Sequence, residues 1–186
     1  MISILERFSK VLIIFLSLII LPAMTYFVME SSGTSINAPQ KKVVYDLPYP
    51  GILPDHPLYF LKIIRDRINE FLTRDSLKKA QLYLNYSDKR VAMALALSSK
   101  GKHQAAINSF SKGEKYFEKI IYLLKEAKKQ GNQAPSSFIE IIKLSNAKHN
   151  ELIGELMKAA PQGLQEDISQ LLDFNLKIKK ELEILP

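Results

Sequence analysis

The sequence contains no cysteine, no tryptophan and only 7 glycines among its 186 residues. Without cysteine, the chain forms no disulfide, carries no thiolate nucleophile or thiolate metal ligand, and takes no lipid anchor through a cysteine. The scarcity of glycine, together with abundant Leu, Ile, Lys, Glu and Ala, favours helix over sheet. Apolar residues make up 47% and charged residues 24%, which is the balance of a globular protein.

The sequence also lacks the common catalytic motifs. It has no glycine-rich phosphate loop, no H-E-x-x-H zinc motif and no G-x-S-x-G nucleophile elbow. The histidines, His56, His103 and His149, are not at metal-ligand spacing. We therefore predict no catalytic residue, no metal, no cofactor and no enzymatic activity.

Several titratable residues in the predicted helices need an interpretation. His149 falls on the apolar stripe of a predicted helix, so we expect a half-buried structural histidine, with a pH-sensing role as the alternative. Glu114 and Glu118 are expected to form ion pairs with Lys115 and Lys119 in neighbouring turns of the same helix. Asp66 and Glu70 are expected to pair with nearby arginines.

Residues 11–29 contain no charged side chain, and a run of 19 residues is about the length that a helix needs to cross a bilayer. They are either an uncleaved transmembrane anchor or a signal peptide whose apolar region is 11–21. Both interpretations leave residues 1–10, with Arg7 and Lys10, in the cytoplasm. The predicted location is the cell membrane, in a single pass, with the body on the extracytoplasmic side, or export after cleavage.

Residues 30–54 read as an extended, proline-rich linker, because each proline fixes its own φ and biases the preceding residue away from the helical region. Its apolar side chains are too numerous for a free linker, so we expect them to lie against the helical body as a strap; they are Tyr45, Leu47, Tyr49, Ile52 and Leu53. A polyproline ligand for a partner domain is the alternative. Asp55 is predicted to cap the first helix.

Apolar residues recur at helical spacing over about 58–72, 76–100, 107–130, 138–156 and 164–185. Asp75 is predicted to cap the second helix, and Gly101 and Gly131 to end the second and third. Gly113 either weakens the third helix or permits close approach of a neighbour. Short turns between long helices predict antiparallel packing, either as a bundle or as a stack of α-hairpins. The fold class is all-α, with a domain at 55–130 and a C-terminal hairpin, 131–186, packed on it.

Four segments carry a family resemblance: "LPDHPLYFLK", "LTRDSLKKAQLYL", "SDKRVAMALAL" and "KGK". Together they make residues 47–102, and more loosely the chain as far as residue 119, resemble the bacterial domain-of-unknown-function family DUF5667. The resemblance implies an exported or membrane-anchored protein in which a proline-rich segment leads into a helical body. It implies no activity, cofactor or catalytic residue.

Residues 62–129 hold 16 Lys and Arg against 7 Asp and Glu. Such an excess is typical either of a solvated helical surface or of contact with an anionic surface such as lipid headgroups or wall polymer. The predicted contact residues are Arg65, Arg67, Lys78, Lys79, Lys89 and Arg90. Nucleic acid is not an expected partner, because an exported body does not meet genomic DNA.

These observations predict a non-catalytic, membrane-anchored extracytoplasmic helical protein that acts as an interaction module in the cell envelope. Its partners would be the membrane, through the N-terminal helix, and a protein or an anionic envelope component. The alternative is a tetratricopeptide-like α-hairpin adaptor for a protein or peptide, suggested by residues 100–117. The sequence leaves the oligomeric state open.

Overall fold

The computed structural model describes residues 42–185. The chain divides into two compact units, Met1–Lys41 and Lys42–Pro186, and the architecture below is that of the second. The predicted membrane segment, 11–29, and the first part of the predicted linker, residues 30–41, lie outside the described residues. Among residues 42–185, no helix is both long enough and apolar enough to cross a membrane. Within the same range the all-α prediction is confirmed, with five α-helices and no strand.

The helices begin and end close to the predicted positions. They are α2 (Tyr59–Leu72), α3 (Ser76–Ser98), α4 (His103–Lys129), α5 (Ser136–Ala159) and α6 (Gln165–Glu183), with a short 3-10 helix at Gln162–Leu164. The Asp75 cap is confirmed, because its Oδ1 accepts from the backbone N–H of Lys78 at 2.8 Å. Gly101 lies beyond the end of α3 with φ of 72°, a conformation that favours glycine.

The predicted cap at Asp55 is wrong. The first helix begins at Tyr59, and its N-cap residue, Leu58, makes no side-chain cap. Asp55 instead forms an ion pair with Lys102, at 2.7 Å between Oδ2 and Nζ. The pair joins the entry of α2 to the turn between α3 and α4, so a tertiary contact has replaced the local one.

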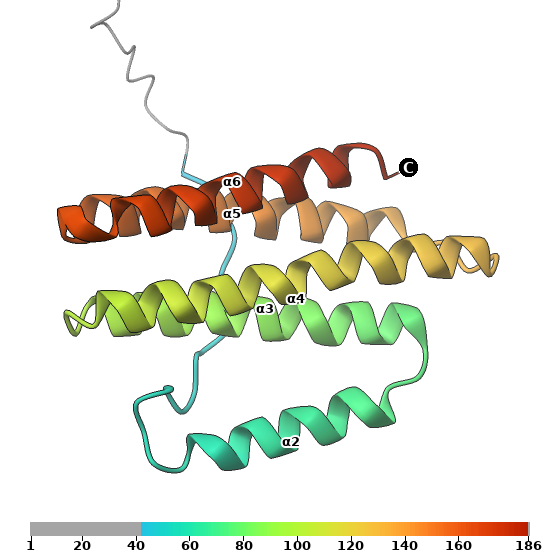
Figure 1. The fold of residues 1–186 in the computed structure, drawn as a ribbon. Helices are drawn as coiled ribbons and strands as arrows, with labels where there is room; N and C mark the ends of the chain where they lie inside the picture. The colour runs from blue at the N-terminus through green and yellow to red at the C-terminus, as the bar shows by residue number, and fades with distance from the viewer. Residues whose placement is uncertain (1–41, 186) are drawn as a thin grey trace, which may run out of the picture. The chain divides into compact units, whose positions relative to one another are not determined.

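Helices α3 to α6 form a closed four-helix bundle. α3 and α4 make one hairpin and α5 and α6 the other; α4 also packs on α6, and α3 on α5, so that the ring closes (Figure 1). One core cluster contains Phe117 and Ile142, and a second contains Phe110 and Ile153. These side chains are fully buried, so the four helices close around an interior filled by their own residues, whereas stacked hairpins would leave a concave surface open.

The predicted strap crosses the bundle before α2 begins. The backbone N–H of Val43 donates to Glu151 of α5 at 2.7 Å, and the Tyr45 hydroxyl donates to Asp88 of α3 at 2.6 Å. Leu47 packs against the second core cluster. Contact with the body is thus confirmed for Tyr45 and Leu47, whereas Tyr49 is 83% exposed. We call residues 43–53 the strap.

The structure settles the role of Gly113. A Cβ built on it would lie 3.1 Å from the carbonyl oxygen of Ser87 and 3.3 Å from Cγ2 of Val91, both in α3. The glycine therefore permits the close approach of α3 and α4. Gly154, inside α5, contrasts with it, because a Cβ there would meet no atom within 4 Å.

We predict opposite effects of filling these two positions. Gly113→Leu should lower the free energy of unfolding by about 1–3 kcal/mol, because it overpacks the α3–α4 contact. Gly154→Ala should raise it by up to about 1 kcal/mol, because alanine is the better helix former. Urea unfolding followed by circular dichroism measures both. Stabilisation by both substitutions would contradict the tight contact at Gly113.

Candidate functional site

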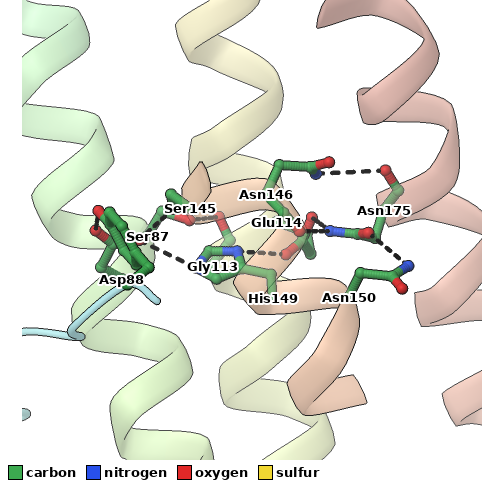
Figure 2. A network of polar contacts seen from close by, with 10 residues as sticks. Ser87, Asp88, Gly113, Glu114, Ser145, Asn146, His149, Asn150 and Asn175 are labelled. Carbon is green, nitrogen blue, oxygen red and sulfur yellow. Dashed lines mark hydrogen bonds and ion pairs between the residues drawn. The ribbon is translucent and has the colours of Figure 1, made fainter. Parts of the chain in front are cut away.

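The centre of the bundle holds a buried histidine between two carboxylates (Figure 2). His149 of α5 lies with Nε2 3.0 Å from Oδ1 of Asp88, in α3, and with Nδ1 2.8 Å from Oε1 of Glu114, in α4. All three residues are buried. A carboxylate only accepts hydrogen bonds, so both ring nitrogens donate, and only the protonated imidazolium can do so. We call Asp88, Glu114 and His149 the buried triad.

Polar groups from other parts of the fold donate hydrogen bonds to the two carboxylates of the triad. Oδ1 of Asp88 also accepts from the Ser145 hydroxyl at 2.6 Å, and Oδ2 accepts from Tyr45 of the strap. Oε2 of Glu114 accepts from the side-chain amide of Asn175, in α6, at 3.3 Å. Every helix of the bundle, and the strap, thus supplies a group to one network.

The carboxylates decide the charge of the histidine. Burial alone would lower the pKa of His149, but the hydrogen bonds and charges of Asp88 and Glu114 outweigh burial and raise that pKa from 6.5 to about 9. Burial, and then the negative charge of Asp88, raise the pKa of Tyr45 well above its ordinary value. At neutral pH His149 is therefore an imidazolium and Tyr45 is neutral.

The sequence interpretation of these residues needs correction. Glu114 does not pair with lysines of its own helix; it is fully buried and bonded to His149. His149 is completely rather than half buried. Asp88 was not singled out at all. A signal was present in the sequence, since Ser145 and His149 lie four residues apart on the face that also carries Ile142 and Leu152.

The geometry of the triad fits a structural clamp. The Ser145 hydroxyl donates to Asp88 rather than to the histidine, and both histidine nitrogens are bonded to carboxylates, so His149 has no free nitrogen with which to activate Ser145. His149 lies between the carboxylates, so the three groups do not converge on one point. No group of three His, Cys, Asp or Glu among residues 42–185 is arranged to hold a metal ion.

Helix α2 attaches to the bundle through its polar side. Its half-buried positions include Lys62, Asp66 and Glu70, and none of its residues is fully buried. The Tyr83 hydroxyl of α3 donates to Glu70 at 2.6 Å, and the Tyr86 hydroxyl donates to the backbone oxygen of Asp66 at 3.1 Å. In Figure 1, α2 lies on the α3–α4 side of the bundle, away from α5 and α6.

The apolar side of α2 consequently faces outward. Six large side chains on it are between 51% and 77% exposed: Phe60, Leu61, Ile64, Ile68, Phe71 and Leu72. We call these six residues the α2 stripe. They belong to the helical repeat of residues 58–72, and an apolar repeat normally indicates the buried face. In α2, the apolar face points to solvent instead.

The six predicted contact residues are only partly brought together. Arg65 and Arg67 are exposed and border the α2 stripe on opposite sides. Lys78 is exposed at the start of α3, whereas Lys79, Lys89 and Arg90 are half-buried. The Arg90 guanidinium lies over the ring of Tyr59, 5.4 Å from its centroid, and so contributes to the attachment of α2.

A groove of about 560 Å³ lies between the strap and α2. Its basic side chains are Lys62, Arg65 and Lys89, and its apolar lining includes Ile52 and Leu61. Burial, only partly offset by the negative charge of Asp66, and repulsion from neighbouring cations lower the pKa of Lys62 from 10.5 to about 8. The groove is therefore a place where an added anion would be stabilised.

The family model described as a domain of unknown function (DUF5667) matches residues 51–163, which is well over half of the chain. The protein belongs to this family. The match extends beyond the resemblance at 47–119 to include α5, and hence all three members of the buried triad. Tyr45 and Asn175 lie outside it. No curated protein and no solved structure matches the chain significantly.

We predict that stability falls as His149 loses its proton. Because the pKa of His149 is raised in the folded state, its contribution is complete below pH 6.5 and is lost as the pH rises through about 9. The free energy of unfolding should decrease by about 2 kcal/mol between about pH 6 and pH 8. The lowered pKa of Lys62 acts in the opposite direction, but only above about pH 8.

Urea titrations across this range measure the change, and NMR should show the His149 ring still protonated at about pH 8. The control is His149→Gln, which should unfold more easily and lose most of the pH dependence. A neutral His149 at pH 7.5 in the folded wild type would refute the assignment.

Removing one hydroxyl should loosen the strap. Tyr45→Phe deletes the bond to Asp88 and leaves a buried carboxylate oxygen with one donor fewer, which costs about 1–3 kcal/mol. We expect a lower urea midpoint and faster proteolytic cleavage within residues 43–53. Tyr49→Phe removes the hydroxyl of an 83% exposed residue and should change neither quantity. Equal cleavage rates for the two variants would argue against the clamp.

Proposed function

We propose that this protein is a non-catalytic interaction module of the cell envelope. Residues 11–29 hold it in the cell membrane, and its helical body lies on the extracytoplasmic side and binds through the outward face of α2. The uncharged run at 11–29 supports the anchor. The basic residues Arg65 and Arg67 belong to the binding face, and Lys89 of α3 lines the groove beside it.

The observation that carries the proposal is the exposure of the α2 stripe. Soluble monomeric proteins rarely expose contiguous apolar patches of this kind unless the patch binds something. The stripe is held in that orientation by specific bonds, because Tyr83 and Tyr86 engage the opposite side of the helix. The buried triad supports the non-catalytic part of the proposal, because its reactive atoms bond to one another inside the bundle.

A tetratricopeptide-like adaptor is the weaker proposal. Such an adaptor would hold a peptide in the concave surface of stacked hairpins. Helices α3 to α6 instead close on each other around a filled core. The groove beside α2 is lined by the strap, by α2 and by Lys89 of α3, rather than by repeated hairpins.

Location and topology are tested together on the full chain. Since the chain contains no cysteine, Tyr122→Cys, at a position 64% exposed on α4, creates a single labelling site. We expect the protein in membranes after an alkaline wash, and a membrane-impermeant maleimide should label position 122 in intact cells. Labelling only after lysis, or recovery from the cytosol, would disprove the proposal. Mass spectrometry of the mature N-terminus distinguishes an anchor from a cleaved signal.

A further inference from the structure

We infer that the occupant of the α2 stripe is the surface of a bilayer that contains anionic lipid. In this arrangement, which rests on the proposed function, α2 lies parallel to the membrane. Its apolar side chains reach the boundary between headgroups and acyl chains, and its basic neighbours contact lipid phosphates. The helix is therefore a second, peripheral membrane contact, separate from the predicted span.

The first argument is the distribution of charge around the stripe. Arg67 lies four residues before Phe71, and Arg65 lies four residues after Leu61, so each arginine borders one edge of the stripe. Both are exposed. Long basic side chains can extend from the edge of an embedded helix to the phosphate layer. An apolar face bounded on both sides by arginine is typical of helices that lie in a membrane interface.

The second argument is the groove between the strap and α2. Lys62, Arg65 and Lys89 line it together with apolar side chains. The cationic neighbours of Lys62 help to lower its pKa, so an anion placed there would relieve their mutual repulsion. Leu61 belongs both to the groove and to the stripe. An acidic headgroup in the groove and an acyl chain along the stripe would thus be adjacent, as they are in one phospholipid.

The third argument is chain length. Residues 30–42 separate the uncharged run from the first strap residue, and 13 residues span at most about 45 Å. The strap begins near α5 and ends at α2, on the other side of the bundle. Because neighbouring helices are about 8–10 Å apart, this length suffices for α2 to reach the bilayer that residues 11–29 are predicted to cross.

A second copy of the chain is a poorer occupant. A helix of 14 residues is only about 21 Å long, which is short for a stable dimer interface formed by one helix from each copy. Pairing two stripes would also bring the Arg67 side chains of both copies together without matching acidic residues on the stripe, since the nearby Asp66 already pairs with Arg65 at 2.7 Å. An anionic lipid surface supplies both the apolar environment and the opposite charge.

The test uses full-length chains with a single cysteine, spin-labelled and mixed with phosphatidylcholine vesicles, with or without phosphatidylglycerol. The labels are placed at Ile64→Cys or Ile68→Cys in the stripe and at Tyr122→Cys on α4 as the control. Electron paramagnetic resonance compares the accessibility of each label to oxygen, which enters bilayers, and to a water-soluble nickel chelate. We expect oxygen to dominate at positions 64 and 68 and nickel at position 122.

The charge requirement is tested on the position-64 label. Arg67→Gln should weaken docking on phosphatidylglycerol vesicles about fivefold, as expected for one basic residue near an anionic surface. Lys179→Gln, which changes the net charge equally at an exposed site on α6, should have no effect. Equal docking of the two variants would overturn the role of lipid charge.

Nickel access at positions 64 and 68 in vesicles would overturn the inference, and so would spin–spin coupling that persists without lipid, which would indicate a second copy. Failure of the proposed anchor would give a result that can be told apart from these. In that case the stripe labels would lie in the bilayer before an alkaline wash, but the chain would be lost from the membrane during the wash. This result would refute the anchor and support docking of α2.

Discussion

The fold depends on a protonated histidine held between two buried carboxylates. Burying any one of these charges without a partner would cost several kcal/mol, so the bundle is considerably more stable when Asp88, Glu114 and His149 meet. The three residues come from three different helices, and the meeting fixes the positions of those helices relative to one another. Apolar packing alone would tolerate small shifts along the helix axes, whereas bonds of 2.8 and 3.0 Å at the two ring nitrogens do not.

The same network explains why the strap is ordered. Its prolines remove backbone donors and keep the segment extended, so it has little secondary structure of its own to hold it. The Tyr45 hydroxyl attaches the strap to the bundle by donating a hydrogen bond to the Asp88 carboxylate. Val43 adds a second contact, with Glu151, which also pairs with Lys148 at 2.7 Å. The entry to the domain is therefore fixed by buried charge, although its sequence has the composition of a linker.

Local signals in the sequence predicted the helices well. Asp75 and Gly101 are a cap and a turn whose physical causes lie within a few residues, and both are where the sequence places them. Contacts between distant residues were not predictable in this way. Asp55 is a residue type that commonly caps helices, but it bonds Lys102, 47 residues away in the sequence. Glu114 has the sequence context of a surface acid, and only the packing of α5 places His149 against it. An apolar periodicity likewise shows that one face of α2 is distinct, but not which way that face is turned.

The orientation of α2 follows from what lies beneath it. The rings of Tyr83 and Tyr86 each lie 5.5 Å from the ring of Tyr116, and the hydroxyls of Tyr83 and Tyr86 donate to α2. Turning the helix by half a rotation would place apolar side chains on these hydroxyls and leave the buried donors without acceptors. The bundle core, already closed by four helices, offers no alternative place for the stripe. The tyrosine surface thus selects the polar side of α2 and leaves its apolar side exposed.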